Sequence, residues 1–370
     1  MTLKNRQPSY IGAHSALRGI ASVTVLLSHA KGFGFISSAG ILHHFVQVFA
    51  WADISVFLFF ILSGFVMSHV YVTPVGWKHF FSARLARLVP VYEVTLLFAL
   101  GVFVFDVGLR HVNVPNLFAN LTLIQQWFPV RNWYSINTPS WSLSVEAFLY
   151  LFAFPLLVFS RTLRWKQPLY FVLILMGAIW GTIYYNYVEE AGSDHPWGLS
   201  LASGLAGFST GFALQSLRGN GLRYPTIAAA IGILLISFSL AYCVAFPLER
   251  TRGLLVLGLI LIVACSTDPA SVCGRVLIRR SLLFLGDISY SLYLWHFPIF
   301  TLVIITRVYL DTKLHNRLEI LIVHNLLALV AVSAAFAAAT ASYYKLEVPF
   351  RRLIRDRFIR AHAGAPLPPS

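Results

Sequence analysis

The chain has 370 residues, of which 58% are hydrophobic and only 11% are charged, with a mean hydropathy of +0.72. These values lie far outside the range of soluble domains and predict an all-α protein that crosses a membrane several times. The formal net charge of +14 is therefore better explained by membrane topology than by binding to nucleic acid. Three scattered cysteines indicate neither a disulfide framework nor a metal site.

Ten apolar segments are candidate membrane spans, which need roughly 17 to 25 residues each. They lie near 13–30, 52–72, 88–106, 141–159, 168–187, 198–215, 226–246, 253–267, 284–306 and 319–342. An even number of spans puts both termini on one side. With the N-terminus inside, 19 of the 28 Lys and Arg residues are cytoplasmic, 8 are outside, and Arg18 lies within the first span. The positive-inside rule thus predicts cytoplasmic termini. We expect residues 1–360 to form one membrane domain and residues 361–370 a disordered tail.

The first span, Ser15 to Ala30, carries an arginine at one end and a histidine at the other. Eleven helical steps put Arg18 and His29 roughly 16 Å apart along the axis, yet within about 20° of the same face. This face cannot point to lipid and should line a protein interior or a water-filled cavity. His29 is either a histidine that bonds between helices or a proton acceptor or acyl carrier. Arg18 either pairs with a carboxylate or binds an anion.

Two features follow in the next spans. Ser63 and Gly64 sit within an apolar helix, where small residues allow neighbouring helices to approach closely. Arg84 and Arg87 then lie one turn apart at the cytoplasmic membrane surface, just before Pro90. The arginine pair either anchors the helix at that surface or clamps a soluble anionic ligand, since guanidinium groups suit phosphates.

In the fourth span, Ser142 and Glu146 occupy positions i and i+4 near its outer start. Glu146 is an acid inside an apolar helix, and it either balances Arg18 or orients and charge-stabilises His29. We interpret a second intramembrane histidine, His296, as structural, because it stands beside the helix break expected at Pro298. Basic residues surround Glu347 near the C-terminus, which indicates a salt bridge.

Six motifs occur together in one order along the chain. They are LRGIAS with a following histidine, FFILSGF, the arginine pair before LVPVY, PSWSLSVE, LGDISYSLYLWHFPI and LEVPFRR. In this order, from Leu17 to Arg352, the chain resembles the acyltransferase family 3 membrane proteins. PSWSLSVE and SYSLYLWHFPI are the most specific of these motifs.

The resemblance implies a multi-pass O-acyltransferase of the bacterial inner membrane. Such enzymes transfer an acyl group, often acetyl, from acyl-CoA to a hydroxyl of a cell-surface or secreted glycan, with no permanently bound cofactor. By the resemblance, His29 matches the essential histidine, Arg84 and Arg87 match the donor-binding pair, and Arg18 and Glu146 match other functional positions. The extra extracytoplasmic hydrolase-like domain of some relatives is not expected, since the sequence stops at Ser370.

These matches predict a site with two ends. Acyl-CoA would dock from the cytoplasm near Arg84 and Arg87 and extend between helices toward His29, which acts as a general base or carries the acyl group. Hydroxyls of Ser142 or Ser144 are candidate hydrogen-bond donors to the developing oxyanion. In a competing interpretation, the chain is a transporter or flippase that uses the same polar residues without acyl chemistry. A third is a passive membrane subunit.

Overall fold

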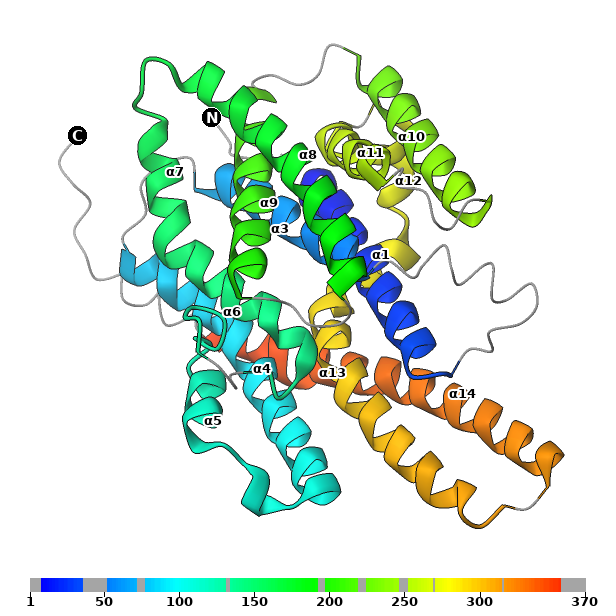
Figure 1. The fold of residues 1–370 in the computed structure, drawn as a ribbon. Coiled ribbons are helices and arrows are strands. Elements are labelled where there is room, and N and C mark those ends of the chain that lie inside the picture. The colour runs from blue at the N-terminus through cyan, green and yellow to red at the C-terminus, as the bar shows by residue number, and fades with distance from the viewer. Residues whose placement is uncertain are drawn as a thin grey trace.

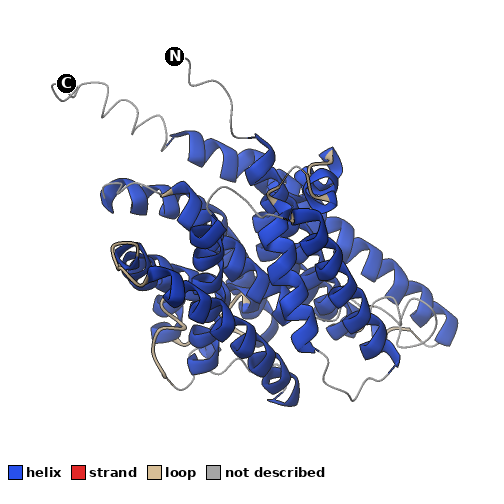
Figure 2. Cartoon of the chain, turned by 90° about the horizontal axis from the view of Figure 1, so that it is seen from above, coloured by secondary structure: helices blue, strands red, loops and turns tan. Residues whose placement is uncertain are grey.

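The computed structural model of the protein describes residues 8–35, 52–71, 77–130, 134–191, 197–218, 224–245, 252–268, 270–314 and 316–353. Within these residues all regular structure is helical and no strand occurs (Figures 1 and 2). This confirms the all-α prediction. The expected disordered tail, 361–370, lies outside the described residues.

Nine long helices make up most of the fold. They are α1 (Pro8–Gly32), α3 (Ala52–Val70), α4 (Trp77–Val107), α8 (Lys166–Ala191), α9 (Trp197–Arg218), α10 (Pro225–Ala245), α11 (Arg252–Ser266), α13 (Arg280–Asp311) and α14 (Arg317–Ser342). Shorter described elements are η1 (Leu109–His111), α5 (Val114–Leu121), η2 (Thr138–Ser140), α6 (Trp141–Phe148), η3 (Leu149–Ala153), α7 (Phe154–Ser160), α12 (Val272–Leu277) and η4 (Tyr343–Glu347).

Two of these elements, η3 and η4, are π-helical turns, and each has a proline directly beyond it. The N–H of Phe154 bonds to the carbonyl of Leu149 in η3, and that of Val348 bonds to the carbonyl of Tyr343 in η4. One residue further on stand Pro155 and Pro349, which lack the N–H that a continuous α-helix needs. The wider turns let each helix continue past its proline, with α6, η3 and α7 as one rod.

Six helical segments within the described residues are long and apolar enough to cross a membrane. They are Phe80–Val107, Thr138–Ser160, Lys166–Ile183, Pro225–Tyr242, Arg280–Asp311 and Ile322–Leu353. Two shorter apolar helices cover Ile54–Val70 and Gly253–Ser266. The chain is therefore a multi-pass membrane protein. Every one of the ten predicted spans falls on a helical region. Only these six segments are both long and apolar enough to cross a membrane, so the number of ten spans stays a prediction.

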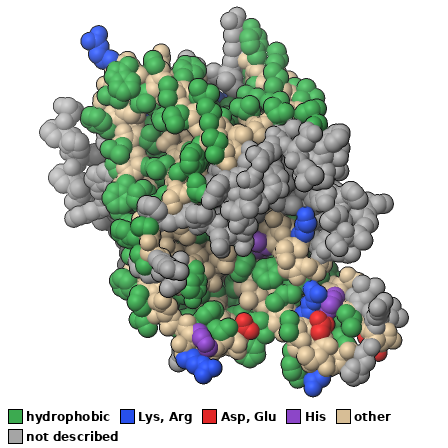
Figure 3. Space-filling view, in the orientation of Figure 1, with side chains coloured by type: hydrophobic (Ala, Val, Ile, Leu, Met, Phe, Trp, Pro, Cys, Tyr) green, Lys and Arg blue, Asp and Glu red, His purple; other side chains and the backbone are tan. Residues whose placement is uncertain are grey.

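Exposed side chains agree with a lipid environment. Helix α8 exposes an apolar stripe at helical spacing, formed by Phe171, Val172, Leu175, Met176, Ile179 and Ile183. Figure 3 shows hydrophobic side chains over much of the visible upper face, while the charged side chains lie mainly towards its lower edge. Exposed apolar area on this scale is typical of a surface covered by acyl chains.

Two helix crossings at glycines bring the central helices into close contact. A Cβ on Gly19 of α1 would lie 2.6 Å from the backbone nitrogen of Gly286 in α13. A Cβ on Gly64 of α3 would lie 1.9 Å from the carbonyl oxygen of Phe208 in α9. No real side chain tolerates these distances to backbone atoms, so both crossings require glycine. The close approach expected at Ser63 and Gly64 is thereby confirmed.

Candidate functional site

Two adjoining cavities lie among the central helices. The first has about 500 Å³ of empty space, part of it open to the outside, and is lined by Arg18, Phe59, Phe60, Arg87, Ser142, Leu143, Glu146, Ser289, Tyr290 and Tyr293. The second has about 710 Å³ of empty space, also partly open, and is lined by His14, Ser15, Arg18, Val66, Arg84, Arg87, Gly286, Asp287, Ser289, Tyr290, Glu347 and Arg351. Four residues line both: Arg18, Arg87, Ser289 and Tyr290. The cavities thus meet at these four residues, and five of the six predicted site residues face one or both of them.

Arg18 stands where the two cavities meet. It interacts electrostatically with Arg87, Tyr150, Glu146 and Arg84. Within the described part of the chain, no carboxylate lies within 4.0 Å of its guanidinium, so Glu146 acts on it across the cavity rather than in a direct ion pair. Three arginines thus surround one carboxylate here, which makes the shared region attractive to an anion.

Arg84 and Arg87 turn into the cavities from α4 rather than toward the membrane surface. The Arg84 guanidinium donates to the Tyr71 hydroxyl at 3.0 Å and lies 5.4 and 5.8 Å from the ring centroids of Tyr71 and Tyr150. The Nε groups of both arginines are buried and have no hydrogen-bond partner among the described residues. Because an unsatisfied buried donor is costly, these groups are suited to an anionic ligand.

Glu146 belongs to a small hydrogen-bonded triangle. One carboxylate oxygen accepts from the Ser63 hydroxyl at 2.8 Å and also from the hydroxyl of Tyr150. The hydroxyls of Ser63 and Tyr150 lie 2.9 Å apart. Tyr150 reaches Glu146 from one turn further along the rod, inside η3. Ser63, which we expected only to assist packing, therefore also holds the acid of the site in place.

The ring that lies beside His29 in the structure is that of His296, so a role for Glu146 in orienting His29 stays a prediction. His29 Nδ1 lies 2.9 Å from Nε2 of His296, and the two rings stack 5.1 Å apart at 22°. Nδ1 of His296 lies 3.0 Å from the carbonyl oxygen of Leu292. His296 is fully buried, as a structural histidine would be, but it is also the ring bonded to His29. The sequence does contain a sign of this pairing. Each histidine stands ten residues after one of the two glycines at which α1 and α13 cross.

The histidine pair adjoins the first cavity without lining it. At the end of that cavity, the hydroxyls of Ser142 and Tyr293 are 2.9 Å apart, and both also donate to the carbonyl of Pro139. The ring of Tyr293 lies 6.1 Å from that of His296. Tyr293 and His296 thus connect Ser142 to His29. Within the described residues His29 is the one predicted site residue that neither cavity includes.

Ser144 does not face the cavity. Its hydroxyl donates to the carbonyl of Leu123 at 2.7 Å and accepts from the backbone N–H of Gln126 at 3.1 Å. The indole of Trp127 donates to the Ser144 carbonyl at 2.8 Å. Ser144 therefore fastens the segment after α5 to α6, and of the two serines considered as oxyanion donors only Ser142 lines a cavity.

Glu347 forms the expected ion pair, but in a buried position. Its carboxylate pairs with Arg351 one turn later and accepts from the Ser291 hydroxyl at 3.0 Å. The side chain is 1% exposed and lines the second cavity together with Asp287. The predicted salt bridge thus contributes to a cavity wall rather than to the cytoplasmic surface.

Sequence reasoning missed a role for Asn137. Pro298 has no N–H, which leaves the carbonyl of Leu294 without its donor within α13. Asn137, immediately before η2, donates its side-chain N–H to that carbonyl at 2.9 Å. Both side chains are buried. The asparagine of NTPSW therefore replaces the hydrogen bond that the proline of WHFP removes.

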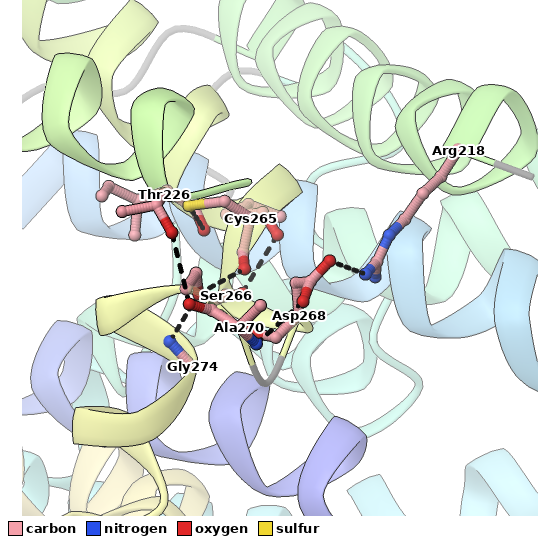
Figure 4. A network of polar contacts seen from close by, with 10 residues as sticks. Arg218, Thr226, Cys265, Ser266, Asp268, Ala270 and Gly274 are labelled. Atoms are coloured by element: carbon pink, nitrogen blue, oxygen red, sulfur yellow. Dashed lines mark hydrogen bonds and ion pairs between the residues drawn. The ribbon is translucent and has the colours of Figure 1, made fainter. Parts of the chain in front are cut away.

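A separate polar network joins α9, α10, α11 and α12 and is structural (Figure 4). Asp268 lies 4.0 Å from Arg218 and caps the backbone N–H of Ala270, while Thr226 donates to the carbonyl of Ala270. Cys265 and Cys273, at the same junction, have free thiols. Throughout the described residues, no group of three or more His, Cys, Asp or Glu side chains could hold a metal ion.

Comparison with known proteins decides the family. A family profile described as an acyltransferase domain, that of acyltransferase family 3, matches residues 13–346. The chain belongs to this family. The match spans all of the residues described above as lining the first cavity, and it includes the histidine pair.

Curated relatives carry names from the same field. The chain is 28% identical to peptidoglycan O-acetyltransferase OatA of Listeria monocytogenes, covering 93% of this chain and 56% of the relative. It is 28% identical to exopolysaccharide production protein ExoZ of Rhizobium meliloti, covering 69% of this chain and 77% of the relative. It is 24% identical to O-acetyltransferase OatA of Staphylococcus aureus, covering 81% of this chain and 52% of the relative. The chain spans about half the length of the O-acetyltransferases it matches. No solved structure matches it.

Proposed function

We propose that this protein transfers an acyl group, with acetyl the first choice, from acyl-CoA to a hydroxyl of a cell-surface or secreted glycan. Family membership and the names of the relatives support O-acyl transfer to a glycan. The observation that carries the proposal is the pair of joined cavities, which offers Arg18, Arg84 and Arg87 at one side and Ser142 and Glu146 at the other.

The proposal includes a topology. Ten spans with both termini in the cytoplasm would place Arg84 and Arg87 at the inner side of a bacterial inner membrane and His29 toward the outer side. The distribution of Lys and Arg supports this orientation. Donor and acceptor then enter from opposite sides, which matches an enzyme that uses cytoplasmic acyl-CoA to modify an exported glycan.

The donor end is the second cavity. The phosphates of acyl-CoA bind Arg84 and Arg87, whose buried Nε groups would gain partners, and Arg18 adds positive charge at the junction. The pantetheine arm then passes from the second cavity into the first, between Arg18 and Tyr290. Glu146 offsets part of the arginine charge in the first cavity. The net positive charge is therefore smaller at the end near Ser142, where the acyl group arrives.

The transfer step uses His29. As a general base, His29 accepts the proton of the acceptor hydroxyl while the hydroxyl oxygen bonds to the thioester carbonyl carbon. The C–S bond breaks, and the proton passes from His29 to the departing CoA thiolate. In the alternative, a His29 ring nitrogen bonds to the thioester carbonyl carbon and the C–S bond breaks, releasing CoA thiolate. The acceptor hydroxyl oxygen then bonds to the acyl carbon, the C–N bond to His29 breaks, and the hydroxyl proton passes to the thiolate. In either route the hydroxyls of Ser142 and Tyr293 are candidate donors to the developing oxyanion, and each would turn from the carbonyl of Pro139 to reach it.

The test is release of CoA from labelled acetyl-CoA by the purified protein with a glycan acceptor, compared with His29→Ala. Acceptor-dependent release that is lost in His29→Ala supports the proposal. Near-normal turnover of His29→Ala would contradict the mechanism. If the protein in vesicles instead moved a labelled glycan across the bilayer without releasing CoA, the transporter interpretation would replace it.

A further inference from the structure

The contact between His29 and His296 determines which ring nitrogens carry protons. Nδ1 of His29 and Nε2 of His296 lie 2.9 Å apart, so one nitrogen donates a proton and the other accepts it. Which one donates follows from the second ring nitrogen of His296. That nitrogen, Nδ1, lies 3.0 Å from the carbonyl oxygen of Leu292.

A carbonyl oxygen can only accept a hydrogen bond, so Nδ1 of His296 carries a proton. His296 is fully buried and lies among aromatic rings, 5.9 Å from Phe300 and 6.1 Å from Tyr293. A second proton would place an uncompensated charge there, next to another histidine, which is strongly unfavourable. Nε2 of His296 is therefore the acceptor, and Nδ1 of His29 is the donor.

We propose that His296 holds His29 in the tautomer that is protonated at Nδ1, and so makes Nε2 the basic nitrogen of the site. This inference rests on the proposed function and adds a positioning residue to it. When Nε2 takes up a proton, Nδ1 keeps its own, and the bond to His296 is unchanged. The ring does not need to rotate or exchange partners during the reaction, which lowers the cost of the proton transfer.

The fold supports this geometry from both helices. Helices α1 and α13 run parallel from the crossing of Gly19 with Gly286, and each histidine follows its glycine by ten residues, or roughly 15 Å. The bond from Asn137 to the carbonyl of Leu294 secures α13 beside Pro298, two residues from His296. The tautomer is thus determined by the packing of α1 against α13, which sets His29 beside His296.

The first experiment reads the tautomer itself and needs no turnover. Protein labelled with ¹³C and ¹⁵N at histidine is compared with the same protein carrying His29→Ala, and the difference spectrum isolates His29. We expect a neutral ring protonated at Nδ1, and in His296→Phe a mixture of tautomers. A ring of His29 protonated at Nε2 in the unmodified protein would overturn the proposal, whether or not the protein transfers acyl groups.

The second experiment measures the consequence. We expect His296→Phe to lower kcat by at least about 100-fold, since a misplaced tautomer disables a general base, and to change KM for acetyl-CoA less than about twofold. His296→Ala should regain activity when imidazole is added. The control is His324→Gln, because His324 pairs with Asp311 at the far end of the α13 to α14 hairpin.

The outcomes separate the two proposals. Loss of activity in His29→Ala with unchanged kcat in His296→Phe would leave His29 catalytic and refute the role of His296. No acyl transfer by the unmodified protein would refute the proposed function, while the spectrum still decides the tautomer. If His296→Phe fails to fold, imidazole rescue of His296→Ala decides: rescue supports the positioning role, and a folded but unrescued variant contradicts it.

Discussion

Asn137 donates a 2.9 Å hydrogen bond to the carbonyl of Leu294, the group that Pro298 leaves without a helical donor. Asn137→Leu keeps the number and branching of the side-chain heavy atoms but removes the donor, so the buried carbonyl loses its partner. We expect the folded state to lose about 1 to 3 kcal/mol, seen as a lower Tm in detergent. Thr138→Ala, at the exposed neighbouring residue, is the control. An unchanged Tm for Asn137→Leu would show that Leu294 finds another donor.

Gly286→Ala should disturb both the packing and the chemistry. A Cβ there would lie 2.3 Å from the carbonyl oxygen of Ser15, so α1 and α13 must move apart. Overpacking of this kind costs about 1 to 3 kcal/mol or more. Because the same two helices carry His29 and His296, their separation should also weaken the His29 to His296 bond, and turnover should fall.

Gly101→Ala is the matched control for Gly286→Ala. Gly101 also lies in a long helix, α4, but a Cβ there would meet nothing within 4 Å. Alanine is the better helix former by about 1 kcal/mol, so this variant should be neutral or slightly more stable. Equal Tm values and turnover for the two alanine variants would contradict a close crossing at Gly286.

The sequence predicted the helices and most of the site because the relevant patterns are local. Helical periodicity placed Arg18 and His29 on one face, and spacing by one turn placed Ser142 and Glu146 together. Five predicted residues do face the cavities. These results need only the geometry of a single helix, which the order of residues fully determines.

The partners across helices were harder to predict. Glu146 was a reasonable partner for His29 by charge, yet Ser63 and Tyr150 bind it, and His296 takes the place beside His29. Such pairings depend on which helices cross and at what height. The crossing of α1 and α13 is set by Gly19 and Gly286, but the sequence alone does not show that these two glycines meet. The role of Asn137 needed the same long-range knowledge.

Arg84→Ala and Arg87→Ala test the donor end. Each removes a guanidinium that faces the second cavity and that we assign to the phosphates of acyl-CoA. Hydrogen bonds to charged groups contribute about 1.5 to 3 kcal/mol, so each variant should raise KM for acetyl-CoA roughly 10- to 100-fold and change kcat less. Arg164→Ala, an exposed arginine after α7, is the control. If KM stayed constant in both variants, the pair would not bind the phosphates of the donor.

Glu146→Gln isolates the charge of the buried acid. The amide is the same size and keeps an oxygen that can accept from Ser63 or Tyr150, so the rod of α6, η3 and α7 should remain folded. Glu146 would no longer offset the positive charge of Arg18 and Arg87 in the first cavity.

We expect acetyl-CoA to bind Glu146→Gln at least as tightly as the unmodified protein, because its phosphates meet more net positive charge. The kcat should fall by about 10-fold or more, since a donor that binds too tightly, or that stops before its acyl group reaches His29, does not react. Equilibrium binding and steady-state kinetics on the same preparation separate the two effects. Glu319→Gln, an exposed acid in the first turn of α14, should change neither. Weaker binding with unchanged kcat would mean that Glu146 contacts the donor directly instead of balancing the arginines.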